Sequence, residues 1–260
     1  LYHTPPAFLR ILRIFKIMDI WKTSDIMKIS PKYPPEKETF MDILYEDARI
    51  LVCIKPAGVV SAGDDEGSMI DLLRKELSDE HACVRSVHRL DAQVSGLMVF
   101  ARSQAAASIL SEQVRTREFE KEYLAAAHGR FKESAGQMED LLWYNRSLRK
   151  SRVMQEPGKD VKRALLSYEV LAYCEDQDVS LVRIRLHTGR THQIRVQFAS
   201  RDHALLGDRK YGAGEQDGCR IALWSHKLSF LHPQSGQPIA FSALPPAEFP
   251  WNLFNLSELS

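Results

Sequence analysis

Short apolar runs separated by polar turns make up most of the chain from residue 43 onward. Residues 43–45 and 50–54 predict two strands joined by a polar turn. Residues 55–58 end the second strand with Lys-Pro-Ala-Gly, because proline fixes φ and glycine permits a positive φ. The run over residues 97–100 is apolar, partly β-branched and too short for a helix, so it predicts a buried strand.

Two segments alternate with the period of two that is typical of a strand. In residues 119–127 this period places Lys121 and Tyr123 on one face, where they can cover an edge of the core or line a cleft. Residues 180–187 place aliphatic side chains on one face, and the opposite face carries Arg183, Arg185 and His187.

Fewer segments show a helical period. Residues 69–77 have the spacing of an amphipathic helix, and Ser103 can cap an Ala-rich helix over residues 104–115. A third helix is expected to begin at Thr191 and to carry Ile194 on its apolar side. Because strands outnumber helices, we expect an α+β fold with a mainly antiparallel mixed sheet, flanked by helices and loops.

The chain has 260 residues and a formal net charge of +1, so any affinity for a polyanion must come from local clustering of cations. Such a cluster lies in residues 145–163. Because this segment also contains Pro157 and Gly158, it predicts a basic hairpin or loop. Its cations are Arg146, Arg149, Lys150, Arg152, Lys159, Lys162 and Arg163. The cluster fits a solvated charged surface, and it equally fits a surface that follows a phosphate backbone.

The ends of the chain and its cysteines say little about chemistry. Four cysteines without CxxC spacing indicate reduced, mostly buried thiols and a cytoplasmic protein. Charged residues interrupt the apolar stretch over residues 8–21, and we find neither a membrane span nor a signal-peptide cleavage site. A basic amphipathic helix, a transit segment or an expression leader would fit residues 1–40.

The segment 87–96 carries the clearest candidate chemistry, because Asp91 stands in an aperiodic loop directly before the buried strand. A charged surface turn would also fit an isolated Arg-x-Asp. A nucleophilic carboxylate needs a neighbouring cation that keeps it ionised. Arg190, which follows a glycine turn, could supply that cation. The sequence has no nucleotide-binding or metal-binding motif, so these residues indicate a cofactor-independent and metal-free site built on one carboxylate.

Residues 88–96 read His-Arg-Leu-Asp-Ala-Gln-Val-Ser-Gly and resemble the HRLDxxTSG signature of the RluA family of RNA pseudouridine synthases. The likeness continues, in the family's order, through the KxY element at 121–123, GRxHQIR at 189–195, the segment 207–212 and His-Pro at 232–233. Five elements in this order cover most of residues 42–246.

The resemblance implies an RNA isomerase that cleaves the N1–C1′ bond of a flipped-out uridine and forms a C5–C1′ bond. Asp91 matches the catalytic aspartate, Tyr123 the tyrosine that stacks on the base, and Arg190 the arginine that pairs with the aspartate. Ile194 matches an apolar pocket wall. Arg89 matches the arginine that can fill the space left by the base. The route, either a covalent bond to the sugar or a glycal intermediate, stays open.

The remaining carried-over residues concern substrate binding. His88, Lys121 and Arg195 belong to the matched motifs, and we expect His88 and His192 to be hydrogen-bonded structural histidines. Candidate contacts to the RNA backbone are Arg146, Arg149, Lys150, Arg152, Arg183 and Arg185. The implied partner is a stem-loop of ribosomal or transfer RNA, because base extraction costs least in loops. We expect a cytoplasmic monomer without a cofactor.

The sequence departs from the family pattern at two positions, with Val94 in place of the usual Thr and Ile54 in place of the usual Asn. Loss of the Thr hydroxyl predicts a slightly less ordered loop with retained chemistry. No S4 RNA-binding signature is present. The expected organisation is a poorly ordered leader and linker over residues 1–40, a catalytic domain over 41–250 and a tail over 251–260.

Two other functions compete with the isomerase. One is a non-catalytic RNA-binding protein, such as an RNA-folding chaperone, which would not require Asp91, Tyr123 and Arg190 together. The other is a glycoside or nucleoside hydrolase, which normally needs a second carboxylate. The matched motifs offer no obvious second carboxylate, and release of free uracil from RNA would identify such a hydrolase.

Overall fold

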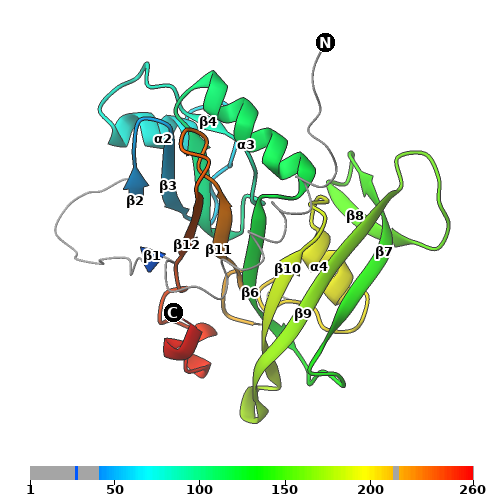
Figure 1. Cartoon of the computed structure of the whole chain (residues 1–260). Helices are drawn as coiled ribbons and strands as arrows, with labels where there is room; N and C mark the ends of the chain where they lie inside the picture. Colours follow the sequence, from blue (N-terminus) through cyan, green and yellow to red (C-terminus); the bar gives the residue numbers. More distant parts are fainter. Residues whose placement is uncertain (1–26, 29–40, 213–216, 260) are drawn as a thin grey trace.

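A computed structural model describes residues 27–28, 41–212 and 217–259, and these form a mixed sheet of twelve strands with three α-helices (Figure 1). The strands are β1 Met27–Lys28, β2 Asp42–Glu46, β3 Ile50–Lys55, β4 Arg85–Ser86, β5 Ser95–Ala101, β6 Glu120–His128, β7 Ala135–Asn145, β8 Lys150–Met154, β9 Lys162–Cys174, β10 Val179–Leu186, β11 Leu223–Leu231 and β12 Pro238–Ser242. The helices are α2 Met69–Glu76, α3 Gln104–Thr116 and α4 Gln193–Ala199, with short 3-10 turns at Glu175–Gln177, Trp251–Leu253 and Ser257–Leu259.

The main sheet runs in the order β2-β3-β5-β11-β6-β10-β9-β7-β8. Its neighbouring strands are antiparallel except for β5 and β11, which are parallel. The predicted fold class, α+β with a mainly antiparallel mixed sheet, is therefore confirmed. Figure 1 shows β6 between two halves of the molecule, one with β3, β11 and α3 and the other with β7–β10 and α4.

Local sequence rules account for most of these elements. The strand predicted over residues 97–100 is the buried core of β5, and the paired strands β2/β3 and β11/β12 are present. Ser103 accepts a hydrogen bond from the amide of Ala106, so it caps α3 as predicted. Ser68 caps α2 in the same way, through the amide of Asp71.

The start of α4 differs from the prediction. His192, not Thr191, occupies the N-cap position, with a φ of +54° and no side-chain capping bond. The Thr191 carbonyl instead accepts a hydrogen bond from the Ser151 hydroxyl of β8. The left-handed turn at His192 redirects the chain, and it sends residues 193–198 into the interior.

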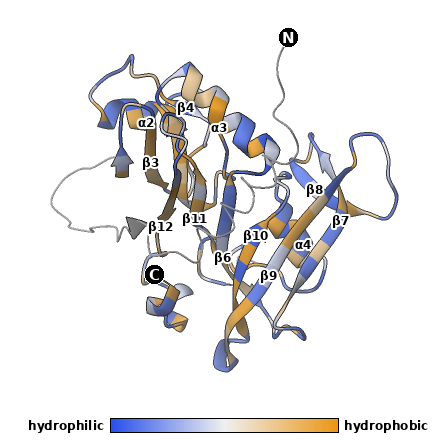
Figure 2. Cartoon of the chain, viewed as in Figure 1, coloured by the Kyte–Doolittle hydropathy of each residue, from blue (hydrophilic) through white to orange (hydrophobic). Residues whose placement is uncertain are grey.

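Hydrophobic side chains cover both faces of the sheet. Residues directly opposite each other on neighbouring strands share a face, and Ile184 of β10 lies opposite Tyr123 of β6. Both belong to a core cluster that includes α2 and α4 residues, whereas Leu124 belongs to a second cluster beside α3. Figure 2 shows β3 as mainly hydrophobic, whereas β7 and β9 mix hydrophilic and hydrophobic residues, which fits the more exposed position of these two strands.

The first and the last of the described segments both contact the fold. Residues 27–28 pair with β12, while the rest of the predicted 1–40 leader lies outside the described residues. Trp251 is buried in the α3-side core, so the segment from 251 onward is packed at its start and is not a free tail there. The four cysteines are free, but only Cys53 is buried, which is fewer than predicted. In the described part of the chain, no helix is long and apolar enough to cross a membrane.

Candidate active site

The loop that carries Asp91 is fixed on both sides by buried hydrogen bonds. The Lys55 side chain is fully buried, and its Nζ donates to the carbonyls of Ala92 (2.8 Å) and Val94 (2.9 Å) and to the adjacent Pro56 carbonyl (2.7 Å). The Ser61 hydroxyl donates to the Leu90 carbonyl and accepts from the Leu90 amide. The side chains of Lys55 and Ser61, both distant in sequence, therefore hold the main chain of this loop.

Gly96 allows β5 to approach β11 directly behind the loop. Its φ is +114°, and a Cβ at this position would lie 2.5 Å from both the amide nitrogen and the carbonyl oxygen of Ser225. The parallel contact between β5 and β11 pairs Gly96 with Ser225, so this pairing needs a residue without a side chain. The glycine of the motif thus joins the Asp91 loop to the centre of the sheet.

Asp91 pairs with Arg195, and the prediction that Arg190 supplies this partner is wrong. Arg195 Nη1 lies 3.2 Å from Asp91 Oδ2. Arg190 is exposed, and its Nε donates to the carbonyl of Arg163 at 2.9 Å. The physical reason is the left-handed turn at His192, because it separates the exposed Arg190 from the buried helix that carries Arg195.

A second carboxylate, Asp208, holds Arg195 from behind. Arg195 Nε and Nη2 donate to the two oxygens of Asp208 at 2.8 and 2.7 Å, which is a bidentate pair. Asp208 is buried and also accepts the amides of Lys210 and Tyr211. The sequence marked residues 207–212 only as one element of the family resemblance, and the Asp-x-x-Tyr pattern gave no signal that its carboxylate turns inward.

His192 lies beside this pair and stays neutral near pH 7. Its Nε2 is 3.9 Å from Asp91 Oδ2, and its Nδ1 is 2.8 Å from the Tyr211 hydroxyl. Because that hydroxyl already accepts the amide of Ser151, its proton is available to His192 Nδ1. Burial lowers the pKa of His192 to about 4. Arg195 is therefore the charged partner of Asp91.

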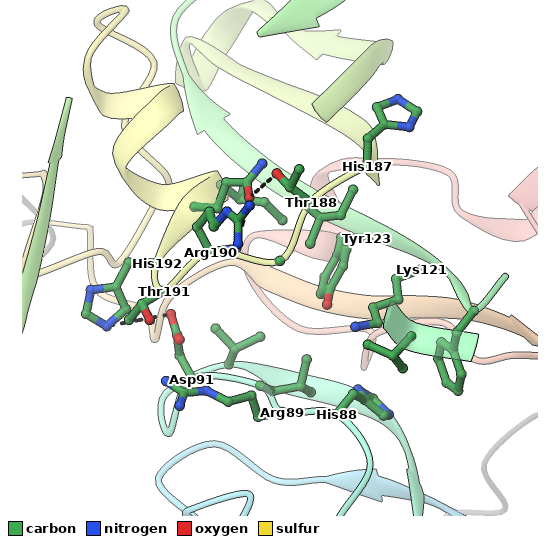
Figure 3. Close-up of a pocket in the computed structure, with 18 of the residues that line it drawn as sticks. His88, Arg89, Asp91, Lys121, Tyr123, His187, Thr188, Arg190, Thr191 and His192 are labelled. Carbon is green, nitrogen blue, oxygen red and sulfur yellow. Dashed lines mark hydrogen bonds and ion pairs between the residues drawn. The ribbon is translucent and has the colours of Figure 1, made fainter. Parts of the chain in front are cut away.

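Strand β6 forms the opposite wall of the site, and its Lys121 and Tyr123 line one cavity with Asp91, as the strand period predicted. Burial, with a smaller contribution from the Asp91 charge, raises the pKa of Tyr123, so its hydroxyl stays protonated at neutral pH. Burial lowers the pKa of Lys121 to about 8. Figure 3 shows the Lys121 ammonium and the Tyr123 hydroxyl pointing into the same space.

Three further predicted residues line the cavity. Ile194 is buried and forms part of its wall, and Arg89 is exposed at its edge beside Asp91. His88 is a buried histidine whose Nε2 accepts the Val99 amide at 3.0 Å, in agreement with the structural role predicted for it. The pKa of His88 lies well below its usual value because the ring is desolvated.

The arginines predicted on β10 do not reach the cavity. Arg183 and Arg185 lie on the opposite face of the sheet from Tyr123, because Ile184 between them shares the Tyr123 face. Both pair with the buried Glu122, and Arg183 also pairs with Glu169. The alternation of β10 was predicted correctly, but its polar face is turned away from the site.

The basic cluster includes the β7–β8 hairpin, which contacts residues beside the site. Arg146, Arg149, Lys150 and Arg152 lie at or beside the turn between β7 and β8. Lys150 Nζ lies 5.0 Å from the centre of the Tyr211 ring, and Lys210 Nζ donates to the Arg149 carbonyl at 2.8 Å. Tyr211 therefore connects this hairpin to His192.

The cavity has a volume of about 710 Å³, and Asp91 is the only acidic side chain among the described residues that line it. The Asp208 side chain is fully enclosed and already bound to Arg195, so it cannot act on a substrate as a second carboxylate. The geometry thus offers one accessible carboxylate, a permanent cation beside it and an aromatic wall opposite. It does not offer the carboxylate pair of a typical glycoside hydrolase.

Comparison with known proteins identifies this arrangement. The family model for RNA pseudouridylate synthase matches residues 49–200, which include the Asp91 loop, the β6 wall and Arg195. The chain belongs to the RNA pseudouridylate synthase family. This enzyme is therefore an isomerase that converts uridine in RNA to pseudouridine.

Relatives with known names cover most of the enzyme. It is 35% identical over 222 residues to the dual-specificity RNA pseudouridine synthase RluA of Escherichia coli strain K12, across 84% of this chain and 98% of that protein. It is 34% identical over 230 residues to an uncharacterized RNA pseudouridine synthase, YhcT, of Bacillus subtilis, across 86% of this chain and 74% of the relative. The structure of human RNA pseudouridylate synthase domain containing 1 superposes with a TM-score of 0.69 at 26% identity, covering 85% of this chain and 89% of that one.

Proposed function

We propose that the enzyme acts on a uridine flipped out of a stem-loop in ribosomal or transfer RNA, with Asp91 as its catalytic residue. The observation that carries the proposal is the hydrogen bond from Arg195 to Asp91, the only acidic side chain on the described cavity wall. The reaction breaks N1–C1′, turns the uracil ring and forms C5–C1′, while C5 loses a proton and N1 gains one. No atom is added or lost overall.

Asp91 has two chemically reasonable roles in this sequence. Its carboxylate can attack C1′ and form an ester that the turned uracil later displaces, or it can remove a ribose proton and give a glycal intermediate. Both routes require an ionised carboxylate held at the sugar. The bidentate Asp208 contact supports either route because it fixes the orientation of Arg195, and Arg195 in turn orients Asp91.

Tyr123 is proposed to stack on the flipped uracil and to keep it next to Asp91. The raised pKa of its hydroxyl favours stacking and hydrogen-bond donation over service as a base, because a phenolate would be rare at neutral pH. Arg89, at the exposed edge of the cavity, is proposed to fill the space that the base leaves in the RNA. Extraction of the base costs a few kcal/mol, and least in a loop.

The identity of the RNA is proposed from chemistry and from one relative's name. The Escherichia coli relative is called dual-specificity, which supports testing ribosomal and transfer RNA side by side. The cations of the β7–β8 hairpin, close to Tyr211 and the cavity, are suited to hold the backbone of a folded RNA. We propose a monomer that works in the cytoplasm.

Tritium release from RNA labelled at uridine C5 tests the proposal. The wild type is expected to release tritium from ribosomal or transfer RNA, and Asp91→Asn, which keeps the size of the side chain, is expected to release none. Asp176→Asn, on an exposed turn, is the matched control and should behave like the wild type. Release of free uracil would identify a hydrolase, and tight RNA binding without release from any RNA would identify a binding protein.

A further inference from the structure

The cavity continues well beyond the catalytic carboxylate. From Asp91 and Tyr123 it follows β6 back towards its beginning and reaches the last turn of α3. The residues lining this second part are Val114, Arg115, Arg117, Phe119, Lys121 and His187. None of them has a part in the breaking or forming of the bonds to C1′, so this end of the cavity, here called the α3 end, needs another explanation.

The α3 end is positively charged. Arg115 pairs with Glu112 on the same helix, but within the described residues no carboxylate forms an ion pair with Arg117 or Lys121. Lys121 instead lies over the Phe119 ring, with its Nζ 5.6 Å from the ring centre. A bound anion would supply Arg117 and Lys121 with the counter-charge that the described residues do not provide.

Arg117 is well placed for an external anion. It ends α3 in the left-handed conformation, with a φ of +65°, and its side chain is exposed while still lining the cavity. Its charge is close enough to His187, across the cavity, to lower the pKa of that imidazole, although desolvation contributes more. Glu120 acts on His187 in the opposite direction, but it does not line the cavity.

Strand geometry relates this end to the substrate. Lys121 and Tyr123 are two residues apart on one face of β6, which places their Cα atoms about 7 Å apart. Figure 3 shows Lys121 on the side of Tyr123 that faces away from His192 and Asp91. A base stacked on Tyr123 with its C1′ at Asp91 would therefore leave the next backbone phosphate within reach of Lys121, and a further one near Arg117.

We infer that the α3 end, through Arg117 and Lys121, binds backbone phosphates of the nucleotides next to the flipped uridine. The inference rests on the proposed function, because it assigns the same RNA strand to the rest of the cavity. The β7–β8 hairpin meets the site from the Tyr211 side, so the RNA would be held from both ends of the cavity. The sequence placed Lys121 among the substrate-binding residues, but for the RNA backbone it pointed only to the hairpin and to β10, and it did not single out Arg117.

The salt dependence of RNA binding tests the inference directly. The probe is a fluorescein-labelled RNA hairpin with an all-uridine loop, titrated by anisotropy at several salt concentrations. Arg117→Gln should bind this probe more weakly and reduce the slope of log Kd against log salt by about one, as expected for one lost phosphate contact. Arg117→Lys should restore the slope, and Arg117→Gln with Lys121→Gln should reduce it further.

Lys75→Gln is the matched control, because Lys75 is an exposed cation on α2 that does not line the cavity. Its slope should equal that of the wild type. An unchanged slope in Arg117→Gln would overturn the inference, and so would an equal decrease in Lys75→Gln. If the wild type releases tritium but Arg117→Gln has the wild-type slope of log Kd against log salt, only this inference fails. If the wild type never releases tritium, the proposed function fails instead.

Discussion

Replacement of Lys55 by Met is expected to release the catalytic loop without changing its sequence. The Lys55 side chain is fully buried, and its ammonium is the common donor for the carbonyls of Pro56, Ala92 and Val94. Methionine has nearly the same length but no donor. The two loop carbonyls belong to Ala92 and Val94, one and three residues after Asp91, so the effect should appear both in the stability of the fold and in the position of the carboxylate.

The magnitude follows from two opposing terms. The Ala92 carbonyl keeps the Gly58 amide as a donor at 2.8 Å. The carbonyls of Pro56 and Val94 lose the Lys55 donor, and at about 1–3 kcal/mol each this costs roughly 2–6 kcal/mol. Methionine also removes the cost of burying an ammonium. Burial lowers the pKa of Lys55 to about 8 from a usual 10.5, which corresponds to about 3 kcal/mol for the charged form. The expected net loss in the free energy of unfolding is the difference between these terms, about 1 kcal/mol.

Two measurements on Lys55→Met check this reasoning. Urea unfolding should show the loss of stability, and tritium release should show a decrease in kcat of about 100-fold, because a misplacement of about 1 Å can cost that much. Lys75→Met removes an exposed lysine from α2 and should leave both the urea unfolding curve and kcat close to those of the wild type. A Lys55→Met variant with wild-type stability and kcat would refute the role assigned to this lysine.

Three other predictions concern packing, the buried ion pair and pH. Gly96→Ala should destabilise the fold by several kcal/mol, because its methyl group would lie 2.5 Å from the Ser225 backbone; a wild-type unfolding curve would contradict this. Asp208→Asn should lower stability by about 3 kcal/mol and reduce kcat, because Arg195 loses a bidentate carboxylate, and unchanged urea unfolding would argue against it. The pKa of His88 is lowered in the folded state, so its contribution to stability is complete above pH 6.5 and is lost by up to about 1.4 kcal/mol per pH unit below it. Urea unfolding at pH 7.5 and 5.5 should show this loss, and His88→Gln should show less of it.

Local physics made much of the fold predictable. Caps, turns and periodicity depend on residues close in sequence, which is why the capping of α3 by Ser103 and the shared face of Lys121 and Tyr123 were predicted correctly. The same applies to the buried strand after Asp91. Five matched motifs also identified the family from the sequence alone.

The partners of the catalytic residue could not be predicted in this way. Both Arg190 and Arg195 belong to one motif, and only the left-handed turn at His192 decides which of them faces Asp91. The Asp208 contact to Arg195 joins two segments that local patterns treat separately. The alternation of β10 gave the correct faces, but the position of the strand in the sheet decides which face meets the cavity.

The sequence by itself thus determined several of the elements and the family, and it singled out Asp91 as the residue proposed to be catalytic. The tertiary structure alone decided how that aspartate is held: by Lys55, 37 and 39 residues away from the carbonyls it binds, and by Arg195, 104 residues away. Such contacts depend on chain segments brought together by the sheet. Hydrogen bonds and ion pairs act over a few ångströms in space, whereas helix and strand patterns record only neighbours along the chain.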